Sequence, residues 1–159
     1  MNSIVIDYYS SDLKEQYPRE NIKAFLDSVC DYLKLDKCEF SVVFSDEEKM
    51  RSLNREYRNI DDSTDILSFA AQDEIDDFVF MVGKRAKRNL GDMVICPDVM
   101  KRNATSFGVS EHEELRRLLV HGILHLCGEN HLTNDSSEPM LIHQENILEA
   151  TFKTKLCEG

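Results

Sequence analysis

Three closely spaced histidines constrain the fold of this chain more than any other feature. His121, His125 and His131 fall within eleven residues, although the whole chain contains only five histidines. Residues four apart lie one turn above each other on the same face of an α-helix, so His121 and His125 can point at one metal ion. Gly128 is suited to end such a helix, because glycine enters the left-handed conformation without steric cost. The chain can then turn back and bring in His131 as a third ligand.

The three histidines predict a catalytic rather than a structural metal site. Three protein ligands leave one coordination position for water, which is the arrangement found in catalytic zinc centres. We therefore expect one Zn²⁺ ion held by the histidines and a water molecule, although three imidazoles also suit nickel, copper or iron. The helix is expected over residues 111–127, with an acidic first turn and an apolar stretch from Leu118 to Leu126 that is typical of a buried helix.

The residue after the first histidine argues against a peptidase. In zinc proteases with the pattern H-E-x-x-H-x-x-G-x-x-H, the glutamate at that position is the general base. Here the position is occupied by Gly122, so the metal ligands are kept and the protease base is missing. Cys127 lies off the face that carries the first two histidines and is not expected to be a ligand. His112 and His143 are expected to be surface residues.

Three stretches of the chain carry a specific combination of motifs. They are Leu53-Asn54-Arg55-Glu56-Tyr57-Arg58 followed by Thr64-Asp65-Ile66-Leu67-Ser68-Phe69, then Leu90-Gly91-Asp92-Met93-Val94-Ile95, then the run from His121 to His131. They are similar to the patterns L-N-x-x-Y-R, T-D/N-V-L-S-F, L-G-D-I-V-I and H-G-x-L-H-L-x-G-x-x-H. In this order and spacing, over roughly residues 40–150, the chain resembles the YbeY family of bacterial rRNA maturation endoribonucleases.

The resemblance implies both a fold and an activity. The implied fold is one α+β domain over residues 1–159, with a small four-stranded mixed sheet surrounded by about five helices. The implied activity is that of a zinc-dependent, single-strand endoribonuclease in rRNA processing, including 3′-end maturation of 16S rRNA, and in ribosome maturation and quality control. The expected partners are ribosomal RNA and the small ribosomal subunit, with a ribosomal protein or a ribosome-assembly GTPase as a further partner, and no membrane.

The resemblance also implies roles for individual residues. Arg58 matches the basic residue that the family is thought to use at its active site, so we expect it to stabilise phosphate charge, with His121 as the second catalytic residue. Either a metal-activated water or the RNA 2′-hydroxyl attacks the phosphodiester, and the sequence does not choose between them. Asn130 stands where the family usually has Asp, which can weaken a contact that tunes metal affinity.

Alternative interpretations remain open at this point. Arg58 can instead form a structural ion pair with Asp61, Asp62 or Asp65. The protein can be a metal-dependent hydrolase of a peptide or a small molecule. It can also be a non-catalytic ribosome assembly factor with structural zinc, which a fourth protein ligand such as Glu129 would favour.

The net charge of −11 is unfavourable for binding RNA. An acidic surface repels phosphate, so RNA binding requires a local basic patch. Arg51, Arg55 and Arg58 recur at helical spacing and form one candidate stripe. A second candidate is the cluster Lys84, Arg85, Lys87 and Arg88. The acidic balance is also compatible with docking onto a basic ribosomal protein.

Hydrophobic periodicity predicts few strands and many helices, which indicates the α+β class. Strands are expected at residues 4–8, 40–44, 66–69 and 93–95. Helices are expected after Pro18, after a capping box that begins at Ser45, from Pro97 to Gly108, over residues 111–127, and after Pro139. The helix after Ser45 is expected to bury Met50, Leu53 and Tyr57, and the last helix Met140, Leu141, Gln144, Ile147 and Leu148. Residues 72–89 are expected to form a polar loop or hairpin beside the active site.

The cysteines and the absence of export signals predict a cytoplasmic protein. The five cysteines show no paired spacing and are expected to be reduced, mostly in the core: Cys30, Cys38, Cys96, Cys127 and Cys157. No N-terminal segment resembles a signal peptide, and no apolar run is long enough to span a membrane.

Overall fold

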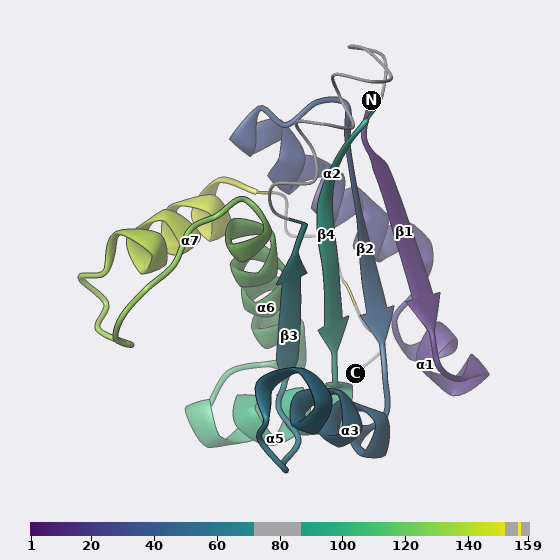
Figure 1. Ribbon diagram of the computed structural model, residues 1–159. Coiled ribbons are helices and arrows are strands. Elements are labelled where there is room, and N and C mark those ends of the chain that lie inside the picture. The colour runs from purple at the N-terminus through teal and green to yellow at the C-terminus, as the bar shows by residue number, and fades with distance from the viewer. Residues whose placement is uncertain (72–86, 152–155, 157–159) are drawn as a thin grey trace.

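A four-stranded mixed sheet forms the centre of the molecule (Figure 1). The computed structural model describes residues 1–71, 87–151 and 156. The strands are β1 (Ser3–Tyr8), β2 (Cys38–Phe44), β3 (Ile66–Ala70) and β4 (Arg88–Ile95), in the order β1-β2-β4-β3. β1, β2 and β4 run parallel, whereas β3 pairs antiparallel with β4 and forms one edge of the sheet. The mixed sheet expected from the sequence is therefore confirmed.

Six helices surround the sheet in the described part of the chain. They are α1 (Ser11–Gln16), α2 (Arg19–Leu33), α3 (Glu47–Arg58), α5 (Pro97–Phe107), α6 (Glu111–Leu126) and α7 (Pro139–Ala150). About five were expected, and the additional one is α1, a short helix that buries none of its residues. Its N-cap is Ser10, whose hydroxyl accepts a hydrogen bond from the Leu13 backbone N–H. Such a helix lacks the buried apolar stripe on which sequence prediction depends.

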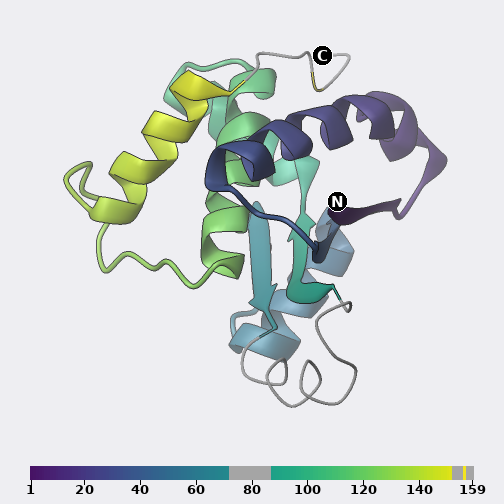
Figure 2. The same ribbon diagram turned by 90° about the horizontal axis from the view of Figure 1, so that it is seen from above.

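The helices lie on both faces of the sheet (Figures 1 and 2). α2 and α6 cover one face, where alternate strand residues such as Phe40, Val42 and Met93 join the main core. α3 lies against one end of the other face, where its Met50 packs with the buried residues Leu67, Val94 and Cys96 in a smaller cluster. The rest of that face is open, because alternate strand residues such as Val5, Glu39 and Asp92 are exposed there. No helix among the described residues is long and apolar enough to cross a lipid bilayer.

The helix that carries the arginine stripe differs in two respects from the sequence expectation. α3 is capped by Asp46 rather than Ser45, because the Asp46 carboxylate accepts a hydrogen bond from the Lys49 backbone N–H. Ser45 instead donates its hydroxyl to the Asp46 carbonyl. Tyr57 was expected to be buried but is 56% exposed, because α3 packs on the sheet through Met50. Asp was a competitor of Ser for the cap, since both residue types are favoured there.

The C-terminal helix and the fourth strand largely follow the expectation. In α7, Met140, Gln144 and Ile147 are buried, and the other two expected inward residues are half-buried. β4 begins at Arg88, earlier than expected, so residues 88 and 89 belong to a strand and not to a loop. The remainder of the expected loop, residues 72–86, lies outside the described part of the chain.

Gly91 allows β4 to pair closely with the edge strand β3. Its φ is +121°, a backbone conformation that side chains rarely adopt. A Cβ atom placed there would overlap Phe69 O and would lie 2.8 Å from Ala71 N, and both are backbone atoms that cannot move independently of the sheet. The register with β2 also shifts at this point, opposite Glu39 and Phe40. Gly91 is therefore required both by its own backbone conformation and by the pairing of β3.

We expect Gly91→Ala to lower the free energy of unfolding by about 3 kcal/mol, since it combines positive-φ strain with a backbone overlap. Gly108 provides a matched control. Its φ is also positive, at +68°, but no atom lies within 4 Å of the Cβ that Gly108→Ala would add. The control should lose only about 1 kcal/mol, the cost of the left-handed conformation alone. Urea unfolding of both variants measures the difference, and equal losses would contradict the role of close strand pairing.

Candidate metal centre

Helix α6 carries the first two histidines, and its ends are defined by local hydrogen bonds. The Ser110 hydroxyl accepts from the Glu113 backbone N–H at 3.1 Å, which caps the first turn. At the other end, Gly128 has a φ of +94°, and the next residue, Glu129, donates its N–H to the Leu124 carbonyl at 2.9 Å. Both the helix and its glycine terminator are confirmed. The turn reverses the chain and brings His131 back toward the helix.

Gly122 has a packing role that explains why the protease glutamate is absent. A Cβ atom at this position would lie 2.8 Å from Met93 Sδ and 3.0 Å from Ile66 Cδ1. Any side chain here would therefore push α6 away from strands β3 and β4, or force Met93 to move within a fully packed core. The glycine lets the metal-binding helix lie directly against the edge of the sheet.

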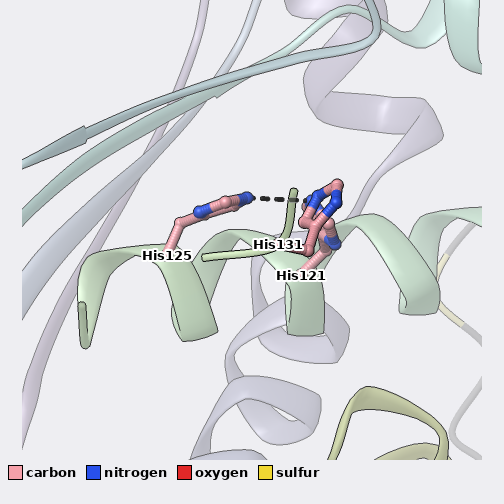
Figure 3. Close-up of side chains that lie close together, drawn as sticks. All are labelled: His121, His125 and His131. Atoms are coloured by element: carbon pink, nitrogen blue, oxygen red, sulfur yellow. Dashed lines mark hydrogen bonds between the residues drawn. The ribbon is translucent and has the colours of Figure 1, made fainter. Parts of the chain in front are cut away.

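The three histidines come together as the sequence predicted. Figure 3 shows the imidazoles of His121 and His125 rising from α6, with His131 beside them. Nε2 of His125 lies 3.0 Å from Nε2 of His121. The ring centroids lie 4.6 to 5.7 Å apart, and one nitrogen from each ring falls within 4.8 Å of the others. Such separations are close enough for all three residues to hold one metal ion.

Neighbouring acceptors orient the imidazole rings. Nδ1 of His121 lies 2.7 Å from Gln144 Oε1, and Nδ1 of His131 lies 2.8 Å from the Thr133 carbonyl oxygen. Because a carbonyl oxygen can only accept, each imidazole donates from Nδ1 and keeps its lone pair on Nε2. Hydrogen bonds of this kind fix the tautomer and the ring orientation of metal-ligating histidines.

The surroundings of His121 and His125 favour the neutral form that metal binding requires. Burial lowers the pKa of His121, the hydrogen bond to Gln144 partly opposes this, and the neighbouring imidazoles lower the pKa further. Burial also lowers the pKa of His125, as does the neighbouring imidazole of His131. Hydrogen bonds to the Asn130 side chain and the Glu129 backbone act in the opposite direction on His125. Asn130 therefore lies where the sequence analysis expected it to act, against a ligand.

The donor set fits zinc with three protein ligands. Nitrogens bound to one tetrahedral zinc ion at about 2.0–2.1 Å lie roughly 3.3–3.4 Å from one another. The nitrogens of His121 and His125 are already near that separation, and His131 closes the set with a small movement. Within the described ranges, no other His, Cys, Asp or Glu joins this cluster.

Two residues that could have supplied a fourth ligand are turned to other positions. Cys127 is exposed and lies outside the histidine cluster. Glu129 binds His143, with its Oε2 2.9 Å from Nδ1. His143 is thus a half-buried partner and not the surface residue that the sequence suggested, and the same holds for half-buried His112, whose Nδ1 accepts the Leu156 backbone N–H. Neither could be recognised from sequence, because their partners are far away in the chain.

The other cysteines agree with the sequence expectation. Cys30, Cys38 and Cys96 are buried and free. Burial raises the pKa of the Cys30 thiol to about 12, so it stays protonated. Cys157 lies outside the described residues.

Arg58 lies beside the histidines in a cavity of about 610 Å³. The cavity wall consists of the edge strand β3 together with Arg58, His121, His125 and Asn130. Arg58 Nη2 donates to the Ser68 carbonyl at 2.9 Å, and its guanidinium lies 5.1 Å from the centre of the Phe69 ring. These two contacts aim the side chain across the strand and leave further N–H groups of the guanidinium for a ligand.

The three arginines of the α3 stripe differ in whether a carboxylate lies beside them. Arg51 forms a two-pronged ion pair with Asp61, at 3.0 and 3.2 Å, and Arg55 lies 3.9 Å from the same carboxylate. Arg58 has no carboxylate partner among the described residues, so the expected alternative of an ion pair with Asp61, Asp62 or Asp65 is not observed. Only the arginine nearest the histidines is thus left for an anionic ligand.

The second basic cluster is only partly described. Lys84 and Arg85 lie outside the described residues. Lys87 donates to the Ser3 hydroxyl at 2.6 Å, and Arg88 is exposed at the start of β4. The cluster therefore remains a prediction.

Sequence analysis missed two parts of the site. Gln144 was expected to be buried, but nothing in the sequence linked it to His121, 23 residues away. The wall formed by β3 was likewise not foreseen, because the position of an edge strand depends on the pairing order of the whole sheet. A buried glutamine on an otherwise apolar helix face was the available signal, since buried polar side chains need partners.

We expect Gln144→Met to lower zinc affinity by about 10- to 100-fold, because His121 loses the acceptor that fixes its tautomer. Methionine has a similar volume and should preserve the packing of α7. The neighbouring exposed residue Glu145, which pairs with Arg117 at 3.2 Å, supplies the control Glu145→Gln. Competition with a chromophoric zinc chelator measures the affinities. Unchanged affinity in the Gln144 variant would show that the hydrogen bond is not needed for metal binding.

Comparisons with known proteins identify the family of this chain. The family model described as Endoribonuclease YbeY matches residues 5–151. Proteins named Endoribonuclease YbeY from Bacillus cereus and Bacillus thuringiensis are each 36% identical over 151 residues, covering 93% of this chain and 96% of theirs. The solution structure of a Thermotoga maritima protein is similar at 27% identity with a TM-score of 0.60, covering 94% of this chain and 88% of that one. The chain belongs to the Endoribonuclease YbeY family.

Proposed function

We propose that this protein is a zinc-dependent endoribonuclease that cuts single-stranded RNA during rRNA processing. The observation that carries the proposal is that one cavity contains two of the three clustered histidines together with an arginine that lacks a carboxylate partner in the described part of the chain. An RNA phosphodiester needs both groups, because negative charge grows on its oxygens as the bond is cut. Relatives that carry the name Endoribonuclease YbeY support this activity.

Arg58 suits the binding of a phosphate. Its guanidinium is planar, permanently charged and able to donate two parallel hydrogen bonds to phosphate oxygens. The contact with Ser68 and the stacking on Phe69 restrict the side chain before substrate binds, so less conformational entropy is lost on binding. We therefore assign phosphate binding and charge stabilisation to Arg58.

The histidines suit a catalytic metal. A zinc ion bound here supplies a Lewis acid that polarises a phosphoryl oxygen and lowers the pKa of a bound water to about 7. The ligands themselves are neutral imidazoles and do not cancel the charge of the ion. His121 lines the cavity that Arg58 also lines, so an anion bound by Arg58 lies next to the metal ligands. The open fourth position argues against the alternative of a purely structural zinc.

A peptide substrate is less compatible with the site. An extended peptide would bind to the free edge of β3 by backbone hydrogen bonds. The Ser68 carbonyl on that edge already accepts a hydrogen bond from Arg58. The position of the protease base is Gly122, where an added side chain would require Met93 to shift. Both observations favour a phosphodiester over a peptide.

The proposed role includes 3′-end maturation of small-subunit rRNA, with the small ribosomal subunit as partner. The acidic net charge of −11 makes free RNA a poor ligand for most of the surface but suits contact with a basic ribosomal protein. A ribosome-assembly GTPase is a further proposed partner. This role places the protein in the cytoplasm, and the buried free cysteines agree with a reducing compartment.

Cleavage of a small-subunit rRNA fragment with an unprocessed 3′ extension tests the activity. We expect the zinc-loaded wild type to cut it, and a His125→Ala variant with unchanged far-ultraviolet circular dichroism to leave it intact. Equal cleavage by both proteins would mean that the activity belongs to another site or to a contaminant. The ends of the product identify the nucleophile, because a 2′,3′-cyclic phosphate arises only when the RNA 2′-hydroxyl attacks.

We expect Arg58→Ala to lower kcat/KM for RNA cleavage by about 100- to 1,000-fold, because a charge-stabilising donor is removed. Zinc affinity should stay unchanged. Arg55→Ala is the matched control, since Arg55 lies three residues earlier on α3 and faces Asp61. It should reduce cleavage far less. Equal losses in the two variants would show that general positive charge on α3, and not the position of Arg58, is what matters.

A further inference from the structure

A second cavity of about 780 Å³ adjoins the metal centre. It shares His121 and Ile66 with the Arg58 cavity, so the two spaces meet at the first metal ligand. Its walls come from the end of α5, from α6, from α7 and from the segment before α7, which lie on one side of the sheet edge in Figure 1. Residues that give it chemical character are Asp65, Phe107, Glu114, Arg117, Asn134 and Gln144.

Glu114 is the unexplained residue in this cavity. It is only 2% exposed, and its Oε2 has no hydrogen-bond partner among the described residues. Its Oε1 lies 3.9 Å from Nε of Arg117, beyond hydrogen-bond distance, and Arg117 binds Glu145 at 3.2 Å instead. Burial raises the pKa of this carboxyl. A buried carboxyl with an oxygen that accepts no hydrogen bond is energetically costly, so a ligand that brought N–H donors to it would recover part of that free energy.

The other walls supply groups that complement a planar, polar ring. Gln144 uses its Oε1 to hold His121, which leaves its amide N–H groups on the cavity wall as donors. Asn134 adds an exposed amide, and Phe107 is 68% exposed at the edge of the cavity. Exposed aromatic rings beside polar groups are the usual means by which proteins stack and read unpaired bases.

We propose that this cavity is a nucleobase subsite that prefers guanine, and that Glu114 is its specificity-determining residue. Guanine carries two adjacent N–H donors, at N1 and N2, which match the two oxygens of one carboxylate. Adenine and cytosine place an acceptor nitrogen beside their amino group, and uracil has a single N–H, so each pairs less well with Glu114. The inference rests on the proposed function, because it assigns the base next to the phosphate that Arg58 holds.

The geometry of the two cavities supports this placement. A phosphate bound by Arg58 lies in the cavity that His121 also lines. The neighbouring nucleotide then lies close to His121, which is also part of the wall of the second cavity. Single-stranded RNA can turn its base out of the stack, whereas a base inside a duplex cannot enter such a space without being unpaired. The subsite would therefore also produce the preference for single strands that belongs to the proposed function.

Equilibrium binding of RNA, measured by fluorescence anisotropy, tests the subsite by a readout other than cleavage. The probes are fluorescent 2′-O-methyl hexauridines that carry one guanine, inosine or adenine, and the all-uridine parent. Zinc-loaded wild type should bind the guanine probe at least about 5-fold more tightly than the others, from the energy of a two-pronged base contact. Inosine lacks the N2 amino group and should lose most of that gain. The probe can bind in any of several positions along its length, so its single guanine can reach the subsite wherever it stands in the probe.

Two variants assign the preference to Glu114. In Glu114→Gln the preference for guanine should fall below about 2-fold, because the amide presents one acceptor instead of two. Glu113→Gln, on the exposed neighbour, should keep the full preference. Phe107→Ala tests stacking at an exposed position on which the fold does not depend. This variant should bind the guanine probe more weakly than the wild type does.

The outcomes separate this inference from the proposed function. Equal affinity of wild type for all probes, or a guanine preference that survives in Glu114→Gln, would overturn the subsite. If rRNA is cut but no base preference exists, only the subsite fails. If guanine is preferred but no RNA is cut, the subsite stands and the proposed nuclease activity fails.

Discussion

The close packing of α6 against β3 and β4 at Gly122 is the contact on which the metal centre depends. It places His121 and His125 directly beside the edge strand, so that Arg58, held across that strand, lies in the same cavity as the ligands. A side chain at Gly122 would require either that the helix move away from the sheet or that Met93 shift within the core. The glycine that stands at the position of the protease base thus also allows the packing that brings His121 and Arg58 to one cavity.

Two further contacts turn this packing into an ordered site. Gly91 lets β3 pair closely with β4, which positions the carbonyl that holds Arg58. On the other side, α7 contributes Gln144, which fixes the ring of His121. The metal ligands are therefore supported from the sheet and from the last helix, and each support comes from a residue distant from α6 in sequence. Rigid support of this kind keeps ligand geometry constant when substrate binds.

Features that depend on local spacing could be predicted from the sequence, and features that depend on packing could not. The i, i+4 histidines, the terminating Gly128 and the boundaries of α5 and α6 follow from helix geometry and capping alone. The exposure of Tyr57 and the pairing of Asp61 with two arginines depend on how α3 and its following loop sit on the sheet. The burial of Glu114, whose Oε2 accepts no hydrogen bond in the described part of the chain, could not be predicted for the same reason, because a charged residue in a first helical turn normally faces solvent.

The acidity of the protein and the proposed RNA substrate are compatible if positive charge gathers at the cavity. In the α3 stripe, Arg51 is paired with Asp61 and Arg55 lies 3.9 Å from the same carboxylate, which reduces the attraction of these two arginines for a polyanion. Arg58 remains available at the cavity, and a metal ion on neutral imidazoles would add charge at the same point. In the proposed function, an RNA chain would be attracted to this cavity more than to the rest of the acidic surface. Such a charge distribution favours specificity for one binding position over total affinity, because phosphate contacts elsewhere on the surface add no favourable binding free energy.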